Sequence, residues 1–223
     1  MRLSITGEIP LTKRSIKYPI YEIWAAWSAL SQAADAHIAG DHEAAERLFR
    51  KSDCKSVWGW LNPAWVDVDK NVIDWKPEND TKWVNKTERD PFRTIPSHVK
   101  KDVLNRDGYQ CRYCGLPVIS ADIRKIAHRL YPDAVPWMPY DMTQQHAAFA
   151  VLWLQYDHVI PHSHKGTSGP ENVVITCALC NFGKHGYTLR QLGVSDPRER
   201  PPSPIAWDGL ERLRAHRPDG MRF

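Results

Sequence analysis

The sequence predicts an α+β protein, in which a mixed N-terminal region rich in tryptophan precedes a ββα unit closed by two cysteine pairs. Three observations support this fold class. Two Cys-x-x-Cys pairs stand in the second half of the chain, two apolar runs with a polar loop between them precede the second pair, and apolar residues recur at helical spacing near the N-terminus. At 223 residues the chain has room for one large domain, or for a small domain with an accessory one.

Four of the five cysteines have the spacing of metal-binding knuckles. Cys111 and Cys114 stand in CRYCG, and Cys177 and Cys180 stand in CALCN. Each pair offers two sulfurs from one tight turn, and structural zinc takes four such ligands in a tetrahedron. The sequence therefore predicts one structural zinc ion bound by all four cysteines.

The ββα unit is predicted from the residues between the cysteine pairs. The apolar stretch AAFAVLWLQY runs into DHVI and is predicted as one strand that ends at Pro161. The loop HSHKGTSGPEN follows, then VVITC as a second strand. A helix is expected from the second knuckle to about Leu192, which completes the unit.

Two helices and a tryptophan-rich stretch are predicted in the N-terminal region. Apolar residues at helical spacing predict a helix over residues 21–39, which Gly40 ends, and Asp41 is expected to cap a second helix in HEAAERLFRK. Residues 57–83 hold short apolar runs broken by Asn-Pro and Lys-Pro, which predicts short strands and turns. Seven of the ten tryptophans lie in residues 1–90. They could stack on nucleic-acid bases, but packing in a core is the favoured interpretation.

Further helices and the domain limits follow from caps and composition. Ser97 is expected to cap a helix in HVKKDVLNRDG, a second helix is expected over residues 122–130, and a short one in IAWDGLERLRAH. The predicted divisions are an accessory region for recognition, dimerisation or docking (1–90), the domain with the ββα unit (91–194) and a Pro- and Arg-rich tail (195–223).

The charge distribution points to a polyanionic partner. Residues 1–90 carry 13 Lys and Arg against 14 Asp and Glu, whereas residues 91–223 carry 17 against 12. A basic excess beside the cysteine pairs fits nucleic acid. No apolar run approaches the length of a membrane span, and the N-terminus lacks the apolar core of a secretory signal, so we expect a cytoplasmic protein without a membrane partner.

Asp157 and His158, held between the cysteine pairs, are the first candidates for chemistry. A carboxylate next to a neutral imidazole suits metal-assisted hydrolysis of a phosphodiester: the carboxylate holds a divalent cation, and the imidazole removes a proton from the attacking water. Asn181, directly after Cys180, supplies an oxygen of the hard type that magnesium or manganese prefers.

These residues resemble the HNH nucleases and their ββα-metal fold. The resemblance covers roughly residues 97–192, in the segments VLNRDGYQCRYCG, YDHVIP, ENVVITC and CALCNFGK. It implies that His158 is the general base and that Asp157 is a ligand of the catalytic metal. It also implies that Asn172 braces the loop joining the strands, and that Asn181 is the second metal ligand.

Two departures from the family pattern matter for the site. Asn181 stands where most members have histidine, which makes this an HNN-type variant and favours magnesium or manganese over zinc or nickel as the catalytic metal. His185 is an alternative ligand, four residues further along the presumed helix. The 42 residues between Cys114 and Asp157 exceed the family's usual spacer and are expected to pack on the zinc site or to shape substrate access.

Phosphate contacts are expected next to these residues. The resemblance places Lys184 near the phosphate, and His162, His164 and Lys165 share the loop between the strands. For the loop histidines a solvated position without a role is the favoured alternative.

Together these inferences predict a metal-dependent endonuclease that hydrolyses DNA, most simply double-stranded DNA, and leaves a 5′ phosphate. The setting expected by analogy is restriction, defence, phage or mobile-element biology. One such site cuts one strand, so a double-strand break would need a homodimer or sequential nicks. The alternative from another class is a zinc-stabilised nucleic-acid-binding module that does not cleave.

Overall fold

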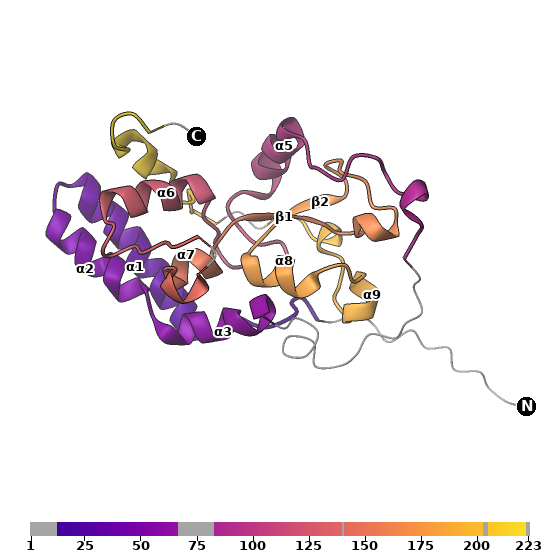
Figure 1. Cartoon of the computed structure of the whole chain (residues 1–223), viewed down its shortest axis with the longest axis horizontal. Helices are drawn as coiled ribbons and strands as arrows, with labels where there is room; N and C mark the ends of the chain where they lie inside the picture. The colour runs from indigo at the N-terminus through magenta and orange to yellow at the C-terminus, as the bar shows by residue number, and fades with distance from the viewer. Residues whose placement is uncertain (1–12, 67–82, 140, 203–204, 222–223) are drawn as a thin grey trace, which may run out of the picture.

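A computed structural model describes residues 13–66, 83–139, 141–202 and 205–221, and it has two parts (Figure 1). Helices from both ends of the chain form one part, and the second part contains a two-stranded sheet with helices around it. The α-helices and strands are α1 (Tyr21–Ile38), α2 (His42–Ser52), α3 (Lys55–Val66), α5 (Ser97–Asp107), α6 (Ala121–Leu130), α7 (Ala147–Val151), β1 (Gln155–His158), β2 (Val173–Thr176), α8 (Ala178–Lys184) and α9 (Leu189–Leu192). Short 3-10 helices are η1 (Lys86–Glu88), η2 (Met142–Gln144), η3 (His162–His164), η4 (Pro197–Glu199) and η5 (Glu211–His216).

The first two helices form a hairpin, as the sequence predicts. Gly40 adopts a φ of +83°, which ends α1, and the side chain of Asp41 accepts a hydrogen bond of 2.9 Å from Ala44 N at the start of α2. Leu30 and Phe49 are completely buried between the helices and their neighbours. None of the described helices is long and apolar enough to cross a bilayer.

The prediction of short strands and turns from residue 57 is wrong for the described part of that stretch. The chain forms the helix α3 there, with Pro63 inside it. The reason is a helical spacing that the Asn-Pro break hides: Val57, Trp60, Leu61 and Ala64 recur on one face, and all four are buried. The rest of that prediction, residues 67–82, lies outside the described residues.

The prediction of one buried strand along the whole apolar stretch before Asp157 is also wrong for part of its length. Its first half is the short helix α7, and only β1 is extended. Every residue of α7 is buried. A run that is apolar on all sides shows no period, so a buried helix and a buried strand look alike in the sequence.

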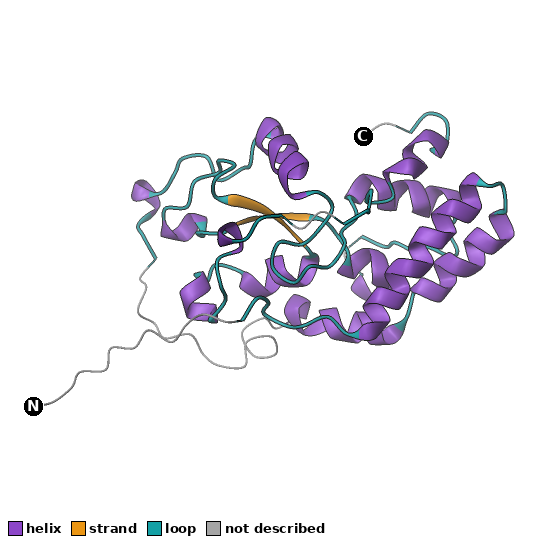
Figure 2. Ribbon diagram, turned by 180° about the vertical axis from the view of Figure 1, so that it is seen from behind, coloured by secondary structure: helices purple, strands orange, loops and turns teal. Residues whose placement is uncertain are grey.

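The two strands and α8 form the predicted ββα unit. β1 and β2 pair in antiparallel register, with Asp157 opposite Val174 and His158 opposite Val173. Figure 2 shows the sheet between helices: α5 contacts β2 and α8 contacts β1. The expected single helix to Leu192 is interrupted, because α8 ends at Lys184 and His185 takes a φ of +48° before α9 begins.

Two smaller expectations need correction. α5 begins at Ser97, but its N-cap is Pro96 and no side chain caps it. The short helix expected in the C-terminal tail is the 3-10 helix η5, which packs on α1 and α6. The helix α6 of the long spacer therefore lies against the tail, while Trp153 at the end of the spacer lines the cavity described below.

A buried carboxylate joins α5 to the sheet. The Oδ2 atom of Asp107 accepts hydrogen bonds from Ile175 N at 3.0 Å and from Arg106 Nη2 at 2.8 Å, and Asp107 is 3% exposed. Removing one member of a buried, hydrogen-bonded charge network leaves the remaining groups unpaired.

We therefore expect Asp107→Ala to lower the free energy of unfolding by about 3 kcal/mol. Chemical denaturation of the zinc-loaded protein measures the change. Asp102→Ala, an exposed carboxylate on the same helix, is the matched control and should shift it by less than about 0.5 kcal/mol. Equal effects of the two variants would contradict the assigned role of Asp107.

Candidate active site

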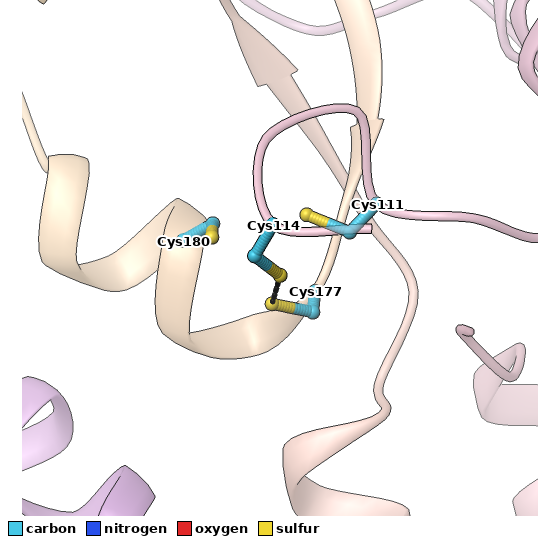
Figure 3. Close-up of side chains that lie close together, drawn as sticks. All are labelled: Cys111, Cys114, Cys177 and Cys180. Carbon is cyan, nitrogen blue, oxygen red and sulfur yellow. Dashed lines mark hydrogen bonds between the residues drawn. The ribbon is translucent and has the colours of Figure 1, made fainter. Parts of the chain in front are cut away.

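The four paired cysteines come together as the sequence predicts. Their sulfur atoms all lie within 4.8 Å of one another, and the sulfurs of Cys114 and Cys177 are 3.6 Å apart. A tetrahedron of zinc–sulfur bonds has edges of about 3.8 Å, so four thiol sulfurs gathered this closely suit a zinc ion. Figure 3 shows that Cys111 and Cys114 come from one loop, while Cys177 and Cys180 flank the first turn of α8.

The cysteine site connects three segments of the chain. Gly115 closes the first knuckle with a φ of +80°, which favours glycine, and donates its N–H to Cys111 O at 3.0 Å. Arg112 N donates to Ile175 O at 2.8 Å, which attaches this knuckle to β2. From the N-terminal region, the hydroxyl of Ser15 lies 3.7 Å from the sulfur of Cys180. The start of α8, where Asn181 stands, is therefore held against the sheet.

A cavity of about 990 Å³ opens beside this unit. Asp157, His158 and Asn181 all line it, as do Lys184, His162 and His185. His164 and Lys165 are not among the lining residues. Lys165 instead forms an ion pair with Glu88 at 3.2 Å, and His164 Nδ1 lies 3.1 Å from the hydroxyl of Ser163.

Asp157 lines the cavity as a buried residue and is held by two side chains. Its Oδ2 accepts a hydrogen bond of 2.8 Å from the hydroxyl of Tyr113, and its Oδ1 lies 3.2 Å from Lys184 Nζ. Burial raises the pKa of Asp157, and the Lys184 ammonium and the Tyr113 hydroxyl oppose that rise. Burial, followed by the nearby Asp157 charge, raises the pKa of Tyr113 well above its usual value, so its hydroxyl remains a donor.

Lys184 is more deeply buried than is expected of a residue that contacts phosphate. The residue is 1% exposed, and its Nζ donates to His158 O at 2.7 Å as well as to Asp157. A lysine ammonium has three N–H groups, so two of them are used inside the protein. A phosphate contact by Lys184 would therefore depend on the third.

His158 is half-buried and electrically neutral near neutral pH. Burial, reinforced by the positive charges of Lys184, His162 and Arg93, lowers the pKa of His158 to about 4. Its Nε2 lies 2.9 Å from the hydroxyl of Ser168. A neutral imidazole can accept a proton, which is what a general base requires.

Asn172 braces the loop between the strands. Its Nδ2 donates to Ile160 O at 3.0 Å and to Thr167 O at 2.8 Å, and its Oδ1 accepts from Ile160 N at 2.9 Å. The loop closes tightly over this side chain, because a Cβ atom at Gly166 would lie 1.7 Å from Ile160 O. The start of this loop directly follows β1, so the brace acts on the strand that carries His158.

Asn181 and His185 lie on the α8 side of the cavity. Asn181 Nδ2 donates to Gln155 Oε1 at 3.4 Å, which leaves its amide oxygen without a hydrogen-bond partner among the described residues. His185 is exposed at the end of α8. Of the two candidate ligands, Asn181 is held more firmly, because it directly follows Cys180 within α8 and its side chain is hydrogen-bonded.

The segment before α5 forms part of this site, although its sequence marks it only as a polar boundary. Trp83, Arg89 and Arg93 line the same cavity as Phe182 of α8. Hydrogen bonds fasten this segment to the loop between the strands: Val84 N donates to Ser163 O at 3.0 Å, and His162 Nε2 donates to Asp90 O at 2.7 Å. The two arginines in the polar stretch NKTERDPFRTIP were the available sequence signal for this part of the site.

The comparisons with known proteins agree with this geometry. Residues 151–186, which hold β1, β2 and α8, match the family model described as HNH endonuclease. No curated protein and no solved structure matches the chain. The matched segment, the two strands with their helix and the four-cysteine cluster are together consistent with an α+β, ββα-metal core similar to that of the HNH endonucleases, as the resemblance implied.

Proposed function

We propose that this protein is a metal-dependent endonuclease that hydrolyses phosphodiester bonds of DNA. The observation that carries the proposal is that Asp157, His158 and Asn181 line one cavity within a segment that matches the HNH endonuclease family. A carboxylate, a neutral imidazole and an amide oxygen are the groups that metal-assisted hydrolysis needs.

Asp157 and Asn181 would hold the catalytic ion. Both offer hard oxygen atoms toward the cavity, and such atoms suit magnesium or manganese better than softer ions. A bound divalent cation would polarise a phosphate oxygen and neutralise charge on the leaving 3′ oxygen. His185 is the alternative ligand if Asn181 does not bind the ion.

The chain's own residues accept the proton and hold the carboxylate of Asp157 in place. His158 accepts the proton of the attacking water, and its neutral state near pH 7 makes it available for this step. Lys184 and Tyr113 fix both oxygens of Asp157, so its carboxylate cannot rotate away. Hydrolysis with in-line attack then leaves a 5′ phosphate and a 3′ hydroxyl.

Basic side chains around the cavity support DNA as the substrate. Arg89, Arg93 and His162 stand on the cavity wall, where they can contact backbone phosphates. One site cuts one strand, so a double-strand break would come from a homodimer or from two nicks. We propose a role in recognition, dimerisation or docking for the predicted accessory region 1–90, except for its last residues from Trp83 onward, which contribute to the cavity wall.

The cysteines and the analogy with HNH nucleases indicate in which compartment and in which biological process the protein acts. Free cysteines arranged for zinc are typical of a reducing compartment, so we place the activity in the cytoplasm. Restriction, defence or mobile-element biology is the setting proposed by analogy with HNH nucleases.

Metal-ligand variants test the assigned site. The zinc-loaded protein is incubated with a labelled DNA duplex, or with RNA of the same sequence, across magnesium and manganese concentrations. We expect the wild type to cut DNA, Asp157→Asn to be slower by about 100-fold, and Asn181→Ala to need more metal ion for the same rate. Asp102→Asn and Asn105→Ala, exposed on α5, are the matched controls and should cut at the wild-type rate. An Asp157→Asn variant as fast as the wild type would refute the site, and equal cutting of RNA would refute the preference for DNA.

A further inference from the structure

A serine in the loop between the strands contacts the imidazole of His158. The hydroxyl oxygen of Ser168 lies 2.9 Å from His158 Nε2, 2.8 Å from Phe92 O and 3.2 Å from Arg93 O. Ser168 is 7% exposed, so water has little access to replace these partners.

The two carbonyl oxygens determine the direction of the hydrogen bond to His158. A backbone carbonyl can only accept, and two oxygen atoms 2.8 Å apart repel unless a proton lies between them. The one hydroxyl proton of Ser168 must therefore point to Phe92 O, with Arg93 O as a weaker second acceptor. The oxygen of Ser168 has only lone pairs left for His158, so Nε2 must be the donor.

This direction assigns the tautomer of His158. A neutral imidazole carries one proton, so a proton on Nε2 leaves the lone pair on Nδ1. Nδ1 forms no hydrogen bond with any residue in the described part of the chain, and His158 lines the cavity. The opposite arrangement, in which Ser168 donates to Nε2, would put the proton on Nδ1 and occupy the remaining lone pair.

Both sides of the Ser168 contact are held independently of His158. On one side, Asn172 donates to Thr167 O at 2.8 Å, next to Ser168. On the other, His162 Nε2 donates to Asp90 O at 2.7 Å and so fixes the segment that presents Phe92 O and Arg93 O. The serine oxygen is therefore a fixed acceptor rather than one that moves with the imidazole.

We propose that Ser168 is a positioning residue that keeps His158 in the Nε2–H tautomer, so that Nδ1 is the atom that takes the proton from the attacking water. The role of Nδ1 rests on the proposed function, whereas the tautomer itself is a property of the resting protein. The segment 83–93 thereby helps to orient the general base His158 in addition to lining the cavity, because it supplies the carbonyl oxygens that orient Ser168.

Nitrogen-15 NMR of the imidazole rings tests the tautomer without any substrate. The full-length, zinc-loaded protein is labelled, and His158 is identified by the signals that disappear in His158→Ala. Near neutral pH we expect a protonated Nε2 and an unprotonated Nδ1 in the wild type and in Ser168→Thr, which keeps the hydroxyl. We expect a mixture of tautomers in Ser168→Ala. A wild-type His158 protonated at Nδ1, or an unchanged tautomer in Ser168→Ala, would overturn the proposal, and neither result depends on catalysis.

Cleavage kinetics give a second readout. We expect Ser168→Ala to lower kcat by about 10- to 100-fold with KM nearly unchanged, and Ser168→Thr to restore most of kcat. Thr167→Ala, which removes the neighbouring hydroxyl bonded to Glu171, is the matched control and should keep the wild-type kcat. A loss confined to KM, or an equal loss in Thr167→Ala, would show a general loop effect and count against the proposal. Absence of cleavage by the wild type would instead refute the proposed function and leave the tautomer to the NMR result.

Discussion

His158→Ala is expected to slow DNA cleavage by about 10²- to 10⁴-fold, which is the range that a general base contributes. The physical reason is that the variant leaves no neutral imidazole at the strand end next to Asp157, while Asp157 and Asn181, the proposed metal ligands, remain in place. Single-turnover cleavage of a labelled duplex by the zinc-loaded variant measures the loss, because binding then contributes little to the observed rate.

A control separates this effect from a change of fold. His128→Ala removes a histidine from α6, whose Nδ1 bonds to Val135 O away from the cavity, and it should cut DNA at the wild-type rate. The zinc content of both variants should match that of the wild type. If His158→Ala keeps the wild-type rate, His158 is not the base.

Loss of one zinc ligand is expected to unfold the ββα unit rather than to slow cleavage alone. Cys111 is 2% exposed and belongs to the cluster that joins the first knuckle to the start of α8. Binding of structural zinc contributes about 10 kcal/mol or more to small zinc domains, which exceeds the usual net stability of a folded domain. For Cys111→Ser we expect the zinc content to fall from about one ion per chain toward zero, with loss of the cooperative thermal transition.

Cys54→Ser is the matched control for this prediction. Cys54 is free and lies outside the four-cysteine cluster, near the hydroxyl of Ser56. The control should retain about one zinc ion per chain and the wild-type melting temperature. A Cys111→Ser protein that keeps its zinc and its melting temperature would contradict the structural role of the site.

The residues that were predictable from the sequence are those that belong to short motifs with a characteristic spacing. The four cysteines could be predicted because each pair forms its own knuckle. Asp157, in the predicted strand, and Asn181, directly after the second knuckle, both line the cavity, and their role as metal ligands stays a prediction. The brace made by Asn172 followed from the family pattern, and the structure shows hydrogen bonds of that kind across the loop. These features depend on few long-range contacts.

The residues that sequence reasoning missed depend on contacts between distant segments. Tyr113 meets Asp157 across 44 positions, and Ser168 meets Phe92 across 76. Tyr113 stands between the two cysteines of CRYC, which was the one available hint that its side chain would be fixed near a metal site. Nothing in the Gly-Thr-Ser-Gly sequence around Ser168 indicates that it contacts His158.

The secondary-structure errors have a related cause. In α3, short apolar runs and a proline hide the helical spacing, and in α7 a run that is apolar on all sides shows no period, so both were predicted as extended chain. Both helices pack against α8 and against each other, so burial from several sides stabilises them. Tertiary contacts of this kind decide between helix and strand where local preference is weak.

The most direct test of the central proposal is whether the zinc-loaded protein cuts supercoiled plasmid DNA. With magnesium or manganese we expect nicked circles first and linear DNA later, and with EDTA in a brief incubation that leaves zinc bound we expect no product. Binding of the same plasmid is measured in parallel by a mobility shift. A folded, zinc-containing protein that binds the plasmid yet leaves it intact with both metals would contradict the nuclease assignment and identify a nucleic-acid-binding module instead.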